Sequence, residues 1–214
     1  MRFEKHCWAE IDLDALLNNY RFIRRTVGGD VCAVLKADAY GHGALAVADA
    51  LRAAGCAAFA VSCLAEAREL RRHGLTEPLL ILGYTDPAFA DELAALDITQ
   101  TLFSSEYAAA LSAAATAAGC TVACHLKADT GMGRIGFALR SDFEASVREM
   151  EACFSLPGIR VAGIFQHFAA ADSTRPEDIA YTQNQHALFV RAVDRLRADG
   201  FDPGVTHCAN SAAQ

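Results

Sequence analysis

The sequence predicts an α/β fold of parallel strands, of the (β/α)8 or TIM-barrel type. Short apolar, β-branched runs alternate with longer amphipathic stretches almost from end to end, which is typical of repeated βαβ units. The chain has 214 residues, and α/β barrels commonly form a single core of more than about 200 residues. No low-complexity linker or charge block divides the sequence, so we expect one domain over residues 1–214.

Seven strands are predicted where apolar runs are bounded by turn residues. They span residues 30–36, 57–62, 78–83, 98–103, 121–127, 160–167 and 205–209. A closed barrel of this type needs an eighth strand, and none is available after Ser211. We therefore expect a barrel that is truncated before its last strand, with unpaired edges on the first and seventh strands.

Helices are predicted between these strands and before the first one. They span residues 13–27, 43–54, 64–73, 86–95, 105–118, 143–154 and 177–199. Glycines such as Gly28 and Gly200 follow the expected helix ends, where a left-handed residue commonly stops a helix. Residues 107–124 carry no formal charge, but we interpret them as an alanine-rich helix ended by Gly119 and followed by a strand, not as a membrane span.

Composition excludes several classes of function. A net charge of −7 gives no general attraction for nucleic acid or for an anionic membrane. The eight cysteines include no Cys-x-x-Cys pair, so we expect reduced thiols and no metal site. Residues Met1–His6 are not followed by a signal-type apolar segment, and we therefore expect a cytoplasmic protein.

Lys36 is the most informative residue for chemistry. It ends the first predicted strand and enters the turn Ala37–Gly43, which reads Ala-Asp-Ala-Tyr-Gly-His-Gly. An apolar surrounding favours the neutral amine, which can attack a carbonyl carbon and form a Schiff base. Backbone N–H groups of the turn could receive an anion nearby. Pyridoxal 5'-phosphate (PLP), which has both an aldehyde and a phosphate, would use both features.

Other polar residues also fall where predicted strands end. Lys127 closes the fifth strand, His167 closes the sixth, and Asn210 follows the seventh. In a barrel, the loops at the carboxyl ends of the strands form the active site. We therefore expect these side chains to gather around Lys36.

Residues Val34–Gly43 resemble the cofactor-lysine motif of alanine racemases, with Leu35 as a mild variant. Further blocks agree with that family in order and spacing. They are Trp8–Leu16, His125–Gly136, Gly163–Asp172 and His207–Ser211. The sequence is therefore identified as a member of the alanine racemase family over essentially its whole length, which implies PLP as the cofactor.

The resemblance implies roles for the residues nearest the reaction. Lys36 would hold PLP as a Schiff base and then act as acid and base on one face of the substrate Cα. Arg134 would lie near the ring oxygen of the cofactor and the substrate carboxylate. His167 would lie against the ring. Lys127 is carbamylated in some members, and the carbamate orients the matching arginine.

The resemblance also implies a phosphate site. Tyr40 would donate its phenol to the phosphate, and Ser211, beside Asn210, would contact it as well. Each of these residues also has a purely structural interpretation. Tyr40 could pack the turn, and Ser211 could be a helix N-cap.

The implied reaction is racemisation of a small amino acid, most naturally L-alanine to D-alanine for peptidoglycan precursors. In the family, the second catalytic base is a tyrosine from the C-terminal β domain of the partner subunit of a homodimer. An arginine that meets the pyridine nitrogen would lie just beyond Gln214. Because neither is present, we expect this chain, as the N-terminal part of such an enzyme, to racemise poorly by itself.

Two other kinds of protein remain open. A single-domain PLP-binding barrel for cofactor homeostasis would explain the short chain, but it would close its barrel. A Schiff-base aldolase would use Lys36 without PLP and would leave Tyr40 and the Asn210–Ser211 pair without a special purpose.

Overall fold

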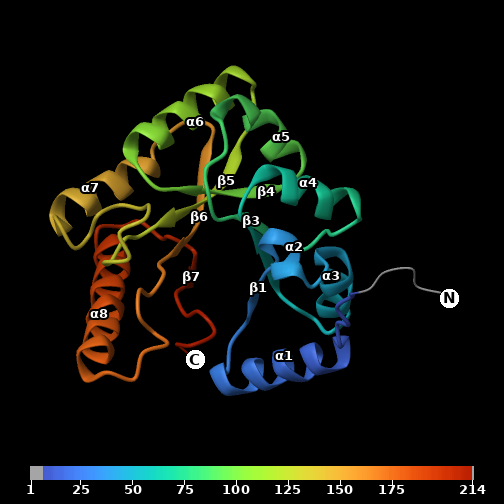
Figure 1. Ribbon diagram of the computed structural model, residues 1–214. Coiled ribbons are helices and arrows are strands. Elements are labelled where there is room, and N and C mark those ends of the chain that lie inside the picture. Colours follow the sequence, from blue (N-terminus) through green and yellow to red (C-terminus); the bar gives the residue numbers. More distant parts are fainter. Residues whose placement is uncertain (1–6, 214) are drawn as a thin grey trace.

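The computed structural model describes residues 7–213 and consists of one parallel sheet with helices packed against it (Figure 1). The seven strands lie side by side in sequence order. They are β1 (Cys32–Val34), β2 (Ala58–Val61), β3 (Leu79–Ile81), β4 (Ile98–Leu102), β5 (Val122–Lys127), β6 (Ile159–Phe165) and β7 (Val205–His207). The predicted α/β class and all seven strands are confirmed. The segment Met1–His6, on which the expectation about a signal peptide depends, lies outside the described residues.

The helices follow the predicted ranges with one addition. They are α1 (Leu13–Val27), α2 (Lys36–Gly41), α3 (Ala44–Ala53), α4 (Leu64–Arg72), α5 (Ala90–Ala95), α6 (Ser105–Ala117), α7 (Phe143–Cys153) and α8 (Pro176–Ala198), with a 3-10 turn at Pro87–Phe89. Helix α2 was not predicted. Because it begins at Lys36, β1 stops at Val34 instead of reaching residue 36.

Local capping explains where several helices begin and end. The carboxylates of Asp12 and Asp142 accept hydrogen bonds from backbone N–H groups three residues later, each at 2.9 Å, as good N-caps do. At the far end of α1, Gly28 has a φ of 63°, and its N–H bonds to the carbonyl of Arg24. The uncharged segment forms α6 and β5 as predicted. No helix within residues 7–213 is long and apolar enough to cross a membrane.

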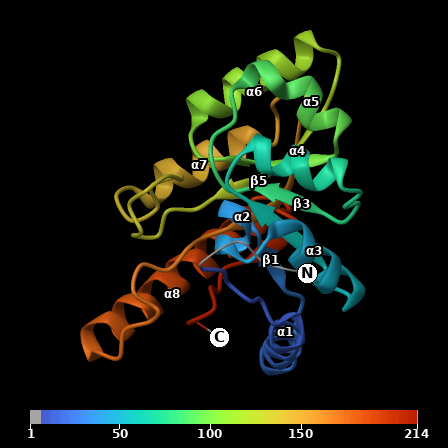
Figure 2. The same cartoon turned by 45° about the vertical axis from the view of Figure 1, so that its right-hand side comes forward.

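The sheet curls, and its two faces differ. Helices α3 to α8 follow its outer face (Figures 1 and 2), and the main core lies between that face and the helices, with Phe59, Ile81 and Leu126 buried in it. Neighbouring residues on a strand point to opposite faces. Ala60, Leu80 and Phe165 accordingly form a separate, smaller cluster on the inner face. Residues in register with them face the inside of the curl.

Candidate active site

A row of three side chains crosses the inner face at the carboxyl ends of the last strands. Lys127 on β5 is in register with Phe165 on β6, and Phe165 is in register with His207 on β7. The imidazole of His207 stacks on the Phe165 ring, with centroids 4.9 Å apart and planes 6° from parallel. The Lys127 Nζ lies 5.3 Å from the centre of the same ring. The sheet thus brings a cation, an aromatic ring and an imidazole together.

Lys127 is one of the most buried charged groups of the described chain, with 6% of its surface exposed. Its Nζ donates to the carbonyl of Ala128 at 3.0 Å. Burial lowers the pKa of Lys127 to about 8, against the opposing effect of Asp129 and with a further contribution from the positive charge of Arg134. With this pKa, roughly one tenth of the amine is neutral at pH 7.

Arg134 is exposed, and its loop folds back on the end of β5. Phe137 donates its N–H to the carbonyl of Lys127 at 2.9 Å, and the N–H of Asp129 donates to the carbonyl of Phe137 at 2.9 Å. The Asp129 carboxylate accepts from the N–H groups of Gly131 and Gly133. These bonds return the loop to the strand end, which explains why Arg134 is close enough to influence Lys127.

His167 follows β6 and is half-buried. Burial lowers its pKa, and the positive charges of Arg134, Lys127 and Lys36 lower it further. The pKa of His167 is thus lowered by charges from three different segments of the chain. His167 is neutral near pH 7.

A buried polar network supports this corner. The hydroxyl of Thr130 donates to the Gln166 side-chain oxygen, and Gln185 on α8 donates to Thr130 at 3.2 Å. The Gln185 oxygen accepts from the N–H of Ala169 at 3.0 Å. The loop after β5, the loop after β6 and helix α8 are thereby joined on both sides of His167.

His207 and His125 are site residues that the sequence prediction missed. His125 lies one pleat below Lys127 on β5, and its Nδ1 is 3.0 Å from the Nε2 of His207. Burial lowers the pKa of each histidine to about 4. The alternation of side chains along a strand could have indicated them. Residues 125 and 127 face the same side of β5, so His125 shares a face with Lys127, and by the same rule residue 207 shares a face with residue 205 of β7.

Lys36 lies at the opposite edge of the sheet and is half-buried. Its Nζ is 5.7 Å from the centre of the Tyr40 ring, which is 61% exposed. Residues Ala37 to Tyr40 all have left-handed backbone angles, with φ between 51° and 56°. L-residues rarely adopt this conformation, which costs roughly 1–2 kcal/mol for each residue.

The turn after Lys36 differs from the expected anion cradle. The N–H of Ala37 bonds to Glu66, that of Gly43 to the Asp38 carbonyl, and that of Ala44 to the Asp38 carboxylate. These amides already have acceptors within the chain. These three amides are therefore not free donors, whereas the Tyr40 phenol is exposed. The anion site expected at this turn stays a prediction.

Asn210 and Ser211 form a turn after β7. The Asn210 side-chain oxygen accepts from the N–H groups of Ala212 and Ala213 at 3.2 Å and 3.1 Å. Ser211 is exposed. Within residues 7–213, no described hydrogen bond or ion pair joins this pair to Lys36 or Tyr40.

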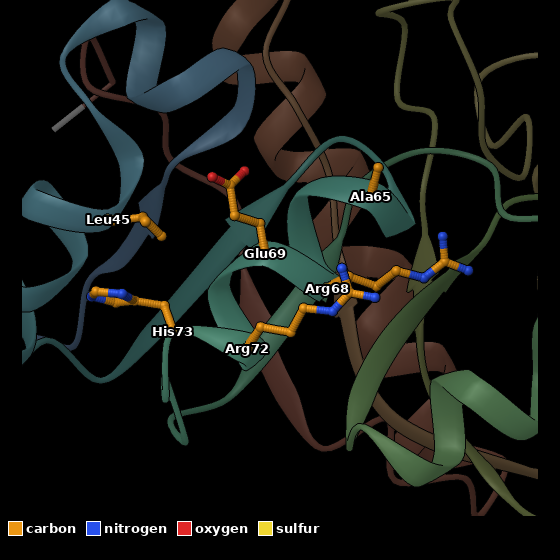
Figure 3. A pocket seen from close by; sticks show the side chains of 6 residues that line it. All are labelled: Leu45, Ala65, Arg68, Glu69, Arg72 and His73. Carbon is orange, nitrogen blue, oxygen red and sulfur yellow. The ribbon is translucent and has the colours of Figure 1, made fainter.

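A shallow hollow of about 560 Å³ lies elsewhere, on the outer side of α4 (Figure 3). Two of the three basic side chains that line it have partners. Arg68 forms a two-pronged ion pair with Glu92 at 2.5 Å, and His73 lies 2.9 Å from Asp49. The hollow is separate from the row on the inner face, so it is not part of the candidate active site.

Comparison with known proteins identifies the family. Residues 11–214 match the model of the alanine racemase N-terminal domain. The chain belongs to the alanine racemase family. An alanine racemase of Desulfovibrio desulfuricans is 44% identical over 213 residues, which are 99% of this chain and 56% of that protein. The chain thus spans about half the length of the relatives it matches.

Solved structures agree with this assignment. The alanine racemase of Clostridium difficile superimposes with a TM-score of 0.90 and 38% identity over 99% of this chain and 57% of that chain. A histidine racemase of Leuconostoc mesenteroides superimposes with a TM-score of 0.81 and 29% identity over 98% of this chain and 54% of that chain. The N-terminal fold of alanine racemases is thus compatible with more than one named racemase.

Proposed function

We propose that this chain is the cofactor-binding part of a PLP-dependent amino-acid racemase, acting on alanine. The observation that carries the proposal is that the positive charges of Lys36, Lys127 and Arg134 all lower the pKa of His167, in a chain that belongs to the alanine racemase family. PLP, when bound, would spread the negative charge that remains after the Cα proton leaves. The remaining steps depend on side chains of the protein.

The residues present fit PLP in their chemistry. Lys36 supplies an amine for the aldehyde, and the exposed phenol of Tyr40 and hydroxyl of Ser211 are donors suited to a phosphate. Asn210 would support Ser211, because its side chain holds the turn that contains the serine. His167, neutral because of burial and three nearby cations, would pack against the ring without adding positive charge.

Lys36 and Arg134 would act on the substrate itself. Lys36 would remove or return the Cα proton on one face, and Arg134 would attract the substrate carboxylate. Lys127 would react with CO2 as a neutral amine: its nitrogen bonds to the carbon, and one proton is released. The depressed pKa of Lys127 supports this, and the resulting carbamate would pair with Arg134.

Inversion requires a second proton donor on the other face of Cα. The hydroxyls of Tyr20, Tyr107 and Tyr181 donate to backbone carbonyls of Gly55, Thr85 and Gly131. They are therefore committed to structural bonds. We propose that the second base comes from a partner subunit in a homodimer, and that the whole protein supplies D-alanine for peptidoglycan precursors in the cytoplasm.

Two measurements test the proposal. PLP is added, the adduct is reduced with borohydride, and the modified lysine is located by mass spectrometry. The sequence contains only three lysines, Lys5, Lys36 and Lys127, so the assignment is simple. We expect reduction to fix PLP on Lys36, and Lys36→Ala to abolish that adduct.

Racemisation of alanine and of histidine is then followed by optical rotation. The assay uses the chain continued through its natural reading frame. Inversion of alanine in preference to histidine is the expected result. Absence of the Lys36 adduct would overturn the cofactor assignment, and an adduct without inversion would favour the PLP-carrier alternative.

A further inference from the structure

The left-handed turn that follows Lys36 is fastened to the rest of the sheet through one carboxylate. Glu66, in the first turn of α4, accepts the N–H of Ala37 on Oε1 at 2.7 Å. Its other oxygen, Oε2, accepts both the N–H and the hydroxyl of Ser62, each at 2.7 Å. Ser62 directly follows β2, so Glu66 links the ends of two neighbouring strands.

A helix cap would use only half of these contacts. Cys63, the N-cap residue of α4, provides no side-chain cap, and Glu66 compensates by reaching back to Ser62. That explains Oε2. It does not explain Oε1, which crosses to a residue 29 positions earlier in the chain. The contact with Ala37 is therefore not explained by capping of α4.

The peptide that Glu66 holds is the one joining Lys36 to Ala37. Four successive left-handed residues begin there, and such a segment persists only where its surroundings fix it. At the other end of the turn, the Asp38 carboxylate bonds the N–H of Ala44 at 2.6 Å. With both ends held, the direction in which the Lys36 side chain leaves the backbone is determined.

Glu66 is suited to this task as an anion. Burial raises the pKa of its carboxyl group, but hydrogen bonds from Ala37, Ser62 and Cys63 outweigh that effect and lower the pKa below its ordinary value. The group is therefore ionised at neutral pH, and both of its oxygens are acceptors.

We propose that Glu66 is a positioning residue for Lys36, fixing the Lys36–Ala37 peptide so that the amine is aimed at the carbonyl it modifies. This inference rests on the proposed PLP chemistry of Lys36. Glu66 contacts neither substrate nor cofactor in this proposal. It acts only through the backbone next to Lys36.

Three variants separate positioning from capping. Glu66→Gln puts an NH2 group opposite one of the N–H donors in either orientation of the amide, so the Ala37 bond or the Ser62 bond is lost. Ser62→Ala removes only the hydroxyl donor from Oε2 and leaves the bond to Ala37. Glu69→Gln, on the same helix but exposed, is the matched control.

The readout is the rate at which borohydride-trapped PLP accumulates on Lys36, with Lys5 as an internal reference for the reagent. We expect Glu66→Gln to slow labelling of Lys36 about tenfold, the effect of losing one charge-assisted hydrogen bond. Ser62→Ala and Glu69→Gln should label Lys36 at the normal rate. Amide hydrogen exchange at Ala37 should accelerate only in Glu66→Gln.

The outcomes distinguish the two proposals. If the unaltered protein labels Lys36, and a Glu66→Gln protein whose Ala37 amide exchanges faster labels it equally fast, Glu66 is only a helix cap and the inference is overturned. If exchange at Ala37 is unchanged in Glu66→Gln, the amide oxygen has kept the Ala37 bond. Glu66→Ala, which removes both acceptor oxygens, then decides by the same comparison. If the unaltered protein does not label Lys36, the proposed function fails instead. Should Glu66→Gln not fold, Glu66→Asp, which keeps the charge but is one methylene shorter, is measured in its place with the same expectation.

Discussion

The Nδ1 atom of His125 lies 3.0 Å from the Nε2 atom of His207, across 82 residues of sequence. A hydrogen bond at this distance requires one nitrogen to donate and the other to accept. Both rings are largely enclosed, and burial lowers the pKa of each to about 4. The bond requires at least one of the two facing nitrogens to be unprotonated, and the lowered pKa values keep both rings neutral near pH 7.

The first prediction concerns pH. The unfolded chain protonates each histidine below about pH 6.5, whereas the folded chain resists until about pH 4. The contribution to stability is thus fully present above about pH 6.5 and is lost as the pH falls toward 4, by at most roughly 3 kcal/mol per histidine. Urea unfolding at about pH 7 and about pH 5 measures the loss. His125→Asn should reduce it by about half, and an unchanged loss in that variant would contradict the assignment.

The second prediction concerns the space beside this pair. A Cβ built on Gly163 would overlap the His125 ring, so Gly163→Ala should destabilise the fold by about 1–3 kcal/mol through overpacking. Gly29→Ala, whose Cβ would meet nothing closer than 4.0 Å, is the control. Denaturant unfolding compares the two. Combining Gly163→Ala with His125→Ala should restore much of the loss, and simple additivity would argue against the overlap.

The third prediction concerns the effect of neighbouring positive charges on the pKa of His167. Because the charge of Arg134 contributes to lowering the pKa of His167, Arg134→Gln should raise that pKa. The imidazole would then take up its proton at higher pH. An NMR titration of the His167 ring follows the shift directly. Arg148→Gln, an exposed residue on α7, should leave the titration unchanged.

The fourth prediction concerns the end of the left-handed turn. Asp38→Ala removes the acceptor of the Ala44 N–H at the start of α3, which should cost about 1–2 kcal/mol of stability. Asp38→Asn keeps an acceptor oxygen for the Ala44 N–H, so it should lose much less stability than Asp38→Ala. Thermal unfolding of the three proteins provides the comparison. Equal losses in both variants would show that the charge of Asp38, and not its hydrogen bond, is what matters.

Most of the fold was predictable because it follows from local periodicity. The carboxyl ends of α1 and α6 were indicated by Gly28 and Gly119, and the structure agrees. The strand ends were predicted too long, since an apolar pattern continues beyond the last ladder bond. The first strand was predicted to reach residue 36, so the start of α2 at Lys36 was not predicted.

The features of the candidate site that were not predicted from the sequence are those that depend on tertiary contacts. Nothing local marks Ala37 or Ala39 as left-handed, because alanine favours the ordinary helix. The bond from Glu66 to Ala37 and the pairing of His125 with His207 join distant segments, and only the assembled sheet brings them together. Strand ends and motif spacing, by contrast, are local features of the sequence, and they indicated Lys36, Lys127 and His167 as candidates at the ends of β1, β5 and β6.

The left-handed turn has a consequence for chirality. A D-amino acid prefers the mirror image of the backbone angles that an L-residue prefers, so Ala37, with a φ of 51° and an exposed side chain, stands where D-alanine would be relaxed. A semisynthetic chain carrying D-alanine at this position should be more stable than the natural one. A protein proposed to make D-alanine thus contains, next to Lys36, a backbone position whose angles suit a D-residue.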